Sequence, residues 1–225
     1  MQNDQSTRKN WKSLKWPLIA VLIFLLLMPL IMFLAARLNS YQLENGADVA
    51  LYSDNGTWDE SVTACKKMFE WMNYTVKLVS ADYINSNGLD KFHVLCVPGG
   101  DMYQYSQDLS STGKSNIKNF VLNGGAYIGI CGGAYFASEK VIWRGSQLYM
   151  TPLGIFSGTA EGPVNEIAPY PDYNMCRVNI VNFTHSITQS EPDAEWILYY
   201  WGPALIPNET ANVSVLGRYA VGNQS

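Results

Sequence analysis

The chain has 225 residues, 48% of them hydrophobic, and its 19 acidic and 15 basic side chains give a net charge of −4. This length and apolar content are enough for one substantial hydrophobic core. A chain with more acidic than basic residues offers no basic surface for phosphates, so DNA and RNA are excluded as partners.

Cysteine and histidine usage argues against a metal site. The two histidines lie far apart in the sequence, and no pair of cysteines has the Cys-x-x-Cys spacing of a zinc site. We therefore predict neither a metal ion nor another cofactor. The four cysteines are Cys65, Cys96, Cys131 and Cys176.

An uncharged apolar run from Leu18 to Ala36 is about as long as a helix that crosses a bilayer. Four basic residues precede this run, so the positive-inside rule predicts that residues 1–17 form a cytoplasmic tail. The rest of the chain is then expected outside the cell membrane, behind a single anchor at residues 18–36. A cleaved signal peptide is the alternative, although its apolar region is usually shorter, at about 7–15 residues.

Residues 37–46 are expected to form a linker, and residues 47–225 a single domain. Short β-rich runs alternate with helical stretches from residue 47 onward, which predicts an α/β fold with a mainly parallel sheet. Strands are expected at residues 48–53, 74–80, 92–97, 126–130, 176–183, 195–202 and 213–220. Helices are expected at residues 57–73, 115–122 and 132–138, the first with an inward stripe of Val62, Cys65, Phe69 and Met72.

The segment Gly129-Ile130-Cys131-Gly132-Gly133 has the pattern of a nucleophile elbow, with cysteine in place of the usual serine. In such an elbow the nucleophile sits on a strained turn between a strand and a helix. The positive N-terminal end of the helix is expected to lower the thiol pKa of Cys131. The alternative is that Cys131 is a small residue that merely fits a tight turn.

A second glycine turn, Pro98-Gly99-Gly100, follows the neighbouring predicted strand. Ligands of open α/β sheets bind at the C-terminal ends of the strands, where both glycine turns are expected. The backbone N–H groups of Gly100 and Gly132 are therefore predicted to bind an oxyanion, and Gly99 and Gly133 to border the same pocket.

These residues carry a resemblance to a known family. "VPGGDMYQY", "FVLNGGAYIGICGGAYFAS" and "GIFSGTAEGP" resemble the class I glutamine amidotransferase-like domain at the N-terminus of biotin-protein ligases. The resemblance implies a flavodoxin-like three-layer sandwich, with Cys131 as nucleophile and Gly100 and Gly132 at the oxyanion positions. It also implies that Glu161 borders the pocket, with an exposed loop residue as the alternative for this glutamate. It does not imply biotin ligation, because that activity belongs to a separate domain.

The resemblance leaves the catalytic base open. Members of this superfamily activate the cysteine with a His-x-Glu pair after the last core strand, and no such pair precedes Ser225. The domain is therefore expected either to be incomplete at its C-terminal end or to lack the usual base. His185 is the substitute base that the sequence offers, with a structural cap on a turn as its alternative role. His93 is expected at the opposite edge of the sheet.

Two functions follow from these observations. The first is a membrane-anchored, extracytoplasmic cysteine hydrolase or amidotransferase-like enzyme that acts on an amide or acyl substrate through Cys131. The second is a binding or scaffold domain that keeps the fold but lacks the base, and presents its pocket to a small molecule or an envelope partner. The aromatic residues of "YYWGPAL", 199–205, are expected either to line that pocket or to pack in a sheet.

Overall fold

The computed structural model describes residues 21, 24–25, 27–34, 47–86 and 88–221. The chain divides into two compact units, Met1–Gly46 and Ala47–Ser225. The described residues of the first unit are helical and exposed. Among all the residues described, no helix is long and apolar enough to cross a membrane. The predicted tail and linker, and parts of the predicted anchor, lie outside the described residues.

A four-stranded parallel sheet forms the centre of the second unit, with the strand order β2-β1-β3-β4. Every residue of β1 is buried, as expected for a strand covered on both faces. The predicted α/β fold with a parallel sheet is thereby confirmed, and β3 is a central strand as expected. The strands are β1 (Val49–Tyr52), β2 (Val76–Val79), β3 (Val94–Val97) and β4 (Ala126–Gly129).

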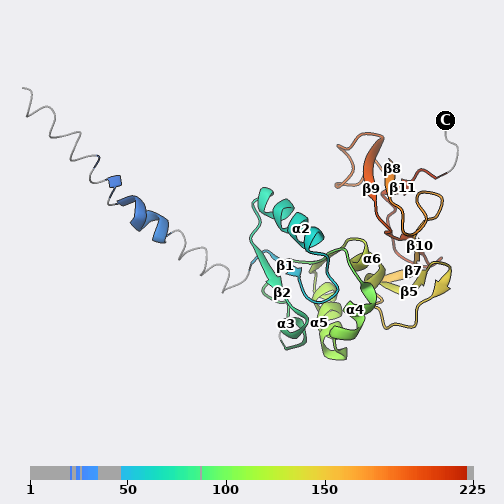
Figure 1. Ribbon diagram of the computed structural model, residues 1–225, viewed down its shortest axis with the longest axis horizontal. Coiled ribbons are helices and arrows are strands. Elements are labelled where there is room, and N and C mark those ends of the chain that lie inside the picture. Colours follow the sequence, from blue (N-terminus) through green and yellow to red (C-terminus); the bar gives the residue numbers. More distant parts are fainter. Residues whose placement is uncertain (1–20, 22–23, 26, 35–46, 87, 222–225) are drawn as a thin grey trace, which may run out of the picture. The chain divides into compact units, whose positions relative to one another are not determined.

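Helices pack on both faces of this sheet. Val62 and Phe69 of α2 join a buried cluster with Val49 and Leu51 of β1, so α2 covers one face. The ring of Tyr52, which alternates with these strand residues, packs against Tyr105 of α4 on the other face. Figure 1 shows α2 on one side of β1 and β2, with α3, α4 and α5 on the other. The helices are α2 (Asp59–Trp71), α3 (Ala81–Ser86), α4 (Met102–Asp108), α5 (Ser111–Leu122) and α6 (Gly132–Ala137).

The inward stripe of α2 is shorter than the sequence predicts. Val62, Cys65 and Phe69 are buried, but Met72 is 48% exposed. The helix ends at Trp71 because Asn73 turns into the left-handed region at φ 63°, and Tyr74 N–H then bonds to the Phe69 carbonyl. Met72 therefore caps the helix and does not extend its apolar face.

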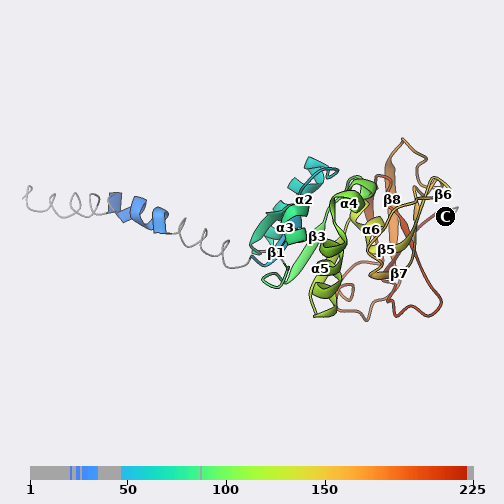
Figure 2. The ribbon, with the colours of Figure 1, turned by 90° about the horizontal axis from the view of Figure 1, so that it is seen from below.

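Two further sheets follow α6, one of four strands and one of three. One has the order β10-β7-β5-β6, with β5 and β7 parallel, and the other is the antiparallel sheet β11-β8-β9. Figure 2 shows the strands after α6 gathered on one side of the unit, with α2 and α3 on the other. The strands are β5 (Ser138–Trp143), β6 (Ser146–Gln147), β7 (Phe156–Gly162), β8 (Asn174–Ile180), β9 (Ala194–Tyr199), β10 (Ala204–Pro207) and β11 (Gly217–Tyr219).

Candidate functional site

Cys131 lies on a sharp turn between β4 and α6, as the elbow pattern predicts. Its backbone has φ 49° and ψ −105°, a conformation that residues other than glycine rarely adopt. It is the N-cap residue of α6, and its carbonyl accepts the N–H groups of Ala134 and Tyr135 at 3.0 and 3.1 Å. The turn therefore holds the thiol at the C-terminal end of the central sheet.

The glycines after Cys131 are needed because the two turns touch through their backbones. A Cβ atom on Gly133 would lie 2.0 Å from the Val97 carbonyl oxygen, and one on Gly132 would lie 2.3 Å from the Gly100 carbonyl oxygen. The Gly133 N–H also donates to the Pro98 carbonyl at 3.2 Å. The elbow is thus fixed against the end of β3.

Two backbone N–H groups face the sulfur. The N–H groups of Gly100 and Gly132 lie close enough to the Cys131 thiol for each of them to lower its pKa. Gly100 has φ 151°, and a Cβ atom there would lie 2.1 Å from the Gly56 carbonyl oxygen. The structure therefore brings together Cys131, Gly100 and Gly132 as the sequence predicts.

The expected low thiol pKa of Cys131 is not found. Burial of the sulfur raises the pKa above its ordinary value of 9.0, and the two N–H groups only partly oppose this effect. The thiolate loses hydration when it is buried, and α6 is only six residues long. The thiol is directed instead at the Tyr200 carbonyl oxygen, with 3.6 Å between sulfur and oxygen.

Cys131 lines a pocket of about 450 Å³. Asp101 is the carboxylate in the lining; among the described residues that line the pocket there is no histidine, lysine or arginine. The side chains come from the loop before α2, from α4, α6 and β5, and from the loops around residues 170 and 201. They are Trp58, Asp101, Met102, Tyr103, Cys131, Tyr135, Trp143, Leu148, Tyr170 and Trp201, joined by the backbone of Gly100.

Five aromatic residues of the lining, all except Tyr103, contact one another in a continuous chain. Trp143 packs edge to face against Tyr135 and Tyr170, with ring centroids 5.6 and 6.1 Å apart. Trp201 contacts Tyr170 at 4.6 Å and Trp58 at 5.9 Å. Trp201 is fixed in place through its backbone carbonyl, which accepts a hydrogen bond from the Tyr135 hydroxyl at 3.0 Å. These rings were not predicted from the sequence, apart from Trp201 as one alternative for residues 199–205.

The segment 199–205 divides between both predicted roles. Trp201 lines the pocket, whereas Tyr199, the last residue of β9, is buried in a cluster with Ala168 and Cys176. The Tyr199 hydroxyl donates to the Gly202 carbonyl at 2.7 Å and accepts the Val164 N–H. Tyr199 therefore anchors the loop that places Trp201 and the Tyr200 carbonyl at the pocket.

The structure does not bring His185 to this pocket. His185 follows β8 at the end of the β8–β9 pair, while Tyr200, next to Cys131, follows the opposite end of β9. The six residues of β9 span about 20 Å. His185 Nδ1 accepts the Ile187 N–H at 3.2 Å, so this side chain caps its own turn. The expected catalytic role of His185 is not supported, and its alternative role as a cap is what the structure shows.

Gly99, Glu161 and His93 were also considered in the sequence. Gly99 lies against the elbow: its N–H donates to Ser61 Oγ at 2.8 Å, and a Cβ atom there would lie 3.4 Å from the Cys131 Cβ. Glu161 is exposed on β7 between β5 and β10 and does not line the pocket. His93 precedes β3 at the opposite edge of the sheet, as expected. In the described part of the chain, no cluster of three or more His, Cys, Asp or Glu side chains forms a metal site.

Comparison with known proteins identifies related sequences. A sequence model of the family described as "Biotin-protein ligase, N terminal" matches residues 47–225. The chain is 26% identical over 184 residues to the biotin–protein ligase of Schizosaccharomyces pombe (strain 972 / ATCC 24843), covering 76% of this chain and 28% of the ligase. It is 31% identical over 133 residues to an uncharacterized protein of Chlamydia muridarum (strain MoPn / Nigg), covering 53% of this chain and 50% of that protein.

Solved structures support the same fold. A crystal structure of a glutamine amidotransferase superposes with a TM-score of 0.55 at 15% identity, covering 76% of this chain and 79% of the other. The chain spans 28% and 50% of the two curated relatives, so their full activities do not transfer to it. With its glutamine amidotransferase-like fold, and with the family model matching all of residues 47–225, the chain belongs to the biotin-protein ligase N-terminal family.

Proposed function

We propose that the domain is a glutamine amidotransferase-like hydrolase in which Cys131 accepts an acyl group from an amide or ester. One observation carries this proposal: two backbone N–H groups, from Gly100 and Gly132, converge on a cysteine sulfur that lines a pocket. Such a pair is suited to stabilise the negative oxygen that forms when a nucleophile attacks a carbonyl carbon.

The strained backbone of Cys131 supports the proposal. A residue other than glycine at φ 49° costs on the order of 1–3 kcal/mol, and glycine would adopt this turn without that cost. If the residue served only to fill the turn, glycine would do so without the strain energy that cysteine carries. Placing the sulfur in front of two N–H donors is a function that explains it.

The reaction follows from these groups. The Cys131 thiolate attacks the substrate carbonyl, the Gly100 and Gly132 N–H groups hold the oxyanion, and collapse breaks the bond to the leaving nitrogen or oxygen, which takes a proton from water and departs as the amine or alcohol. Water then hydrolyses the acyl-cysteine. Since no histidine lines the pocket within the described residues, the thiol proton is expected to leave to solvent. Biotin ligation is not part of this proposal, because only the N-terminal family of the ligases is matched.

Hydrolysis of nitrophenyl acetate tests the proposal and its pH dependence. The Cys131 pKa lies above 9.0, so the reactive thiolate is the minor form at neutral pH. The rate should therefore rise about tenfold per pH unit below 9.0 and continue to rise above it. Nitrophenolate release is measured from pH 7 upward, with Cys131→Ala subtracted as background and Cys176→Ala as a control that keeps the wild-type rate. A rate that Cys131→Ala leaves unchanged would contradict the proposal.

A second candidate function is a non-catalytic binding domain. The raised thiol pKa and the hydrogen bond from Cys131 to the Tyr200 carbonyl favour this alternative, because both keep the thiol protonated. It predicts a ligand that binds wild type and Cys131→Ala equally, with no ester turnover by either. The nitrophenyl acetate assay therefore separates the two functions.

We further propose that residues 18–36 anchor the domain in the cell membrane, with the N-terminus in the cytoplasm and the domain outside. The support is the uncharged apolar run and the basic residues before it. The full chain should sediment with membranes and resist alkaline carbonate, and a chain starting at Ser40 should not. Release of the full chain by carbonate would contradict the anchor.

A further inference from the structure

The charges around the pocket restrict what it can bind. Asp101 is an exposed carboxylate of the lining, and within the described residues that line the pocket no lysine, arginine or histidine balances it. A free amino acid such as glutamine carries a carboxylate of its own. Placing that carboxylate in this pocket would oppose two like charges with no basic side chain among the described residues of the lining, which is unfavourable when water is partly excluded. The Arg144 guanidinium contacts the Tyr170 ring but does not line the pocket.

The walls of the pocket have the chemistry that binds cations. Three tryptophans and three tyrosines line it, and the rings of Trp143 stand at 75° and 73° to their neighbours Tyr135 and Tyr170. These contacts are edge to face, and the faces of aromatic rings attract positively charged groups. The chain shows this attraction at one ring of the lining, because the Arg144 guanidinium lies 4.9 Å from the centre of the Tyr170 ring.

The pocket has a buried end and an exposed end, and its carboxylate, Asp101, belongs to the turn that faces Cys131. Tyr135 is 1% exposed, whereas Trp58 and Tyr103 are 36% and 47% exposed, so the aromatic wall runs from a buried end to the surface. Asp101 follows Gly100 directly, and Gly100 supplies one of the N–H donors to Cys131. A cation held by the rings and Asp101 therefore lies close to an acyl group placed at the sulfur.

We infer that the ligand of this pocket is a compound with an alkylammonium group and no carboxylate, which carries an acyl carbon toward Cys131. The position of the acyl carbon rests on the proposed function; the preference for a cation rests on the lining alone. In the reaction of a thioester, the carbonyl carbon forms a bond to the Cys131 sulfur and breaks its bond to the leaving sulfur. The Cys131 proton passes to hydroxide, and the leaving thiolate takes a proton from water.

Binding is tested on the full-length Cys131→Ala chain by calorimetry, which separates affinity from chemistry. The probes are choline, dimethylbutanol, which replaces its ammonium nitrogen by carbon, and betaine, which adds a carboxylate. Choline should bind about tenfold more tightly than dimethylbutanol, and also more tightly than betaine. Equal affinity for choline and dimethylbutanol, or tighter binding of betaine, would overturn the inference.

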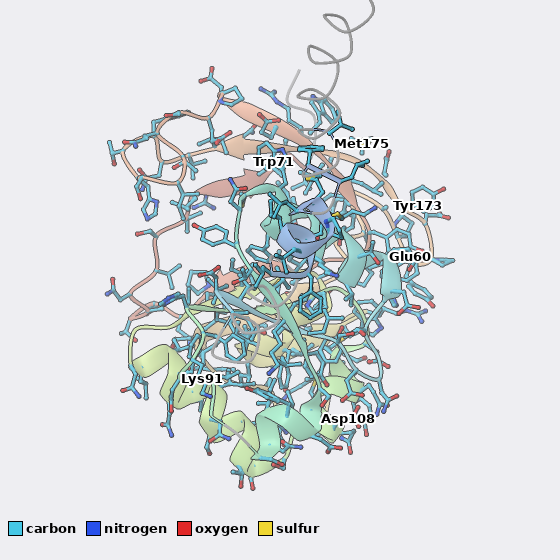
Figure 3. All side chains as sticks on the ribbon, turned by 90° about the vertical axis from the view of Figure 1, so that its left-hand side faces the viewer. Glu60, Trp71, Lys91, Asp108, Tyr173 and Met175 are labelled. Atoms are coloured by element: carbon cyan, nitrogen blue, oxygen red, sulfur yellow. The ribbon has the colours of Figure 1, made fainter. Side chains whose placement is uncertain are left out.

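Asp101→Asn is the matched variant. Asp101 Oδ1 caps α4 by accepting the Tyr103 N–H at 2.9 Å, and an asparagine oxygen can accept the same bond. In the Cys131→Ala background, this change should reduce the preference for choline several-fold and leave dimethylbutanol binding unchanged. Trp71→Leu is the control, because Trp71 lies at the end of α2 (Figure 3), is 82% exposed and does not line the pocket. An unaltered choline preference in Asp101→Asn would contradict the role of its charge.

Acylation of the wild-type chain distinguishes the inference from the proposed function. Acetylthiocholine should acetylate Cys131 faster than the thioacetate of its dimethylbutyl isostere, as read from the intact mass. If neither compound acylates Cys131 but choline still binds preferentially, the proposed function fails and the cation preference stands. If both acylate at equal rates and choline shows no preference, the proposed function stands and the inference is overturned.

Discussion

Replacing Gly132 by glycolic acid, which turns one backbone amide into an ester, should slow acylation of Cys131 about 10²–10³-fold. The change removes the Gly132 N–H and adds no atom where a Cβ would collide with the Gly100 carbonyl oxygen. The lost N–H is at the first turn of α6, where backbone donors have no partner within the helix. The effect on rate is therefore expected without a matching loss of the fold. Pre-steady-state release of nitrophenolate measures it.

The control is the same replacement at Gly145. That glycine lies in a surface turn with no atom within 4 Å of a built Cβ, so an ester there should leave acylation unchanged. Circular dichroism establishes that both ester proteins are folded. If the ester at residue 132 acylates as fast as wild type, the Gly132 N–H does not serve the oxyanion.

Gly133→Ala should destabilise the domain by at least about 3 kcal/mol. An alanine in a helix would ordinarily be favoured over glycine by about 1 kcal/mol. Here the added Cβ would lie 2.0 Å from the Val97 carbonyl oxygen, a backbone atom of the central strand that cannot move aside. The collision reverses the usual preference for alanine over glycine in a helix. It also pushes the elbow away from the end of β3. Urea unfolding of the purified chain measures the change in free energy.

Gly145→Ala provides the comparison for this prediction. Its backbone has φ 76° and open space around the built Cβ, so alanine there meets backbone strain without a collision, at a cost of about 1 kcal/mol. Two variants of equal stability would show that the contact between Gly133 and Val97 has little energetic weight.

The first half of the domain could be predicted from the sequence because its signals are local. Continuous apolar runs mark β1 and β3, and the spacing of Val62, Cys65 and Phe69 marks the buried face of α2. The helices α3 and α4 were not predicted because they have only six and seven residues, too few for a periodic pattern. Strands β5, β6, β7 and β10 were also missed, since β7 contains three polar or charged residues and two glycines that do not alternate with apolar ones.

Part of the candidate site could also be predicted from the sequence, and part could not. The elbow and its glycines could be predicted because the turn itself demands glycine at fixed spacing. The aromatic wall could not, because Trp58, Trp143, Tyr170 and Trp201 come from four separate segments that only the fold brings together. The thiol pKa of Cys131 was expected in the wrong direction, because the sequence shows the N–H donors but not the burial of the sulfur.

The most direct test of the nucleophile is the mass of the chain when its reaction with nitrophenyl acetate at alkaline pH is quenched with acid before the acyl-cysteine hydrolyses, followed by peptide mapping. Three of the four cysteines are buried and Cys131 is half-buried at the pocket, so one acetyl group is expected, on the peptide that contains Cys131. The acetylated species should be absent from Cys131→Ala. A chain that acquires no acetyl group, or acquires it elsewhere while Cys131 stays free, would contradict the assignment of Cys131 as the acyl acceptor.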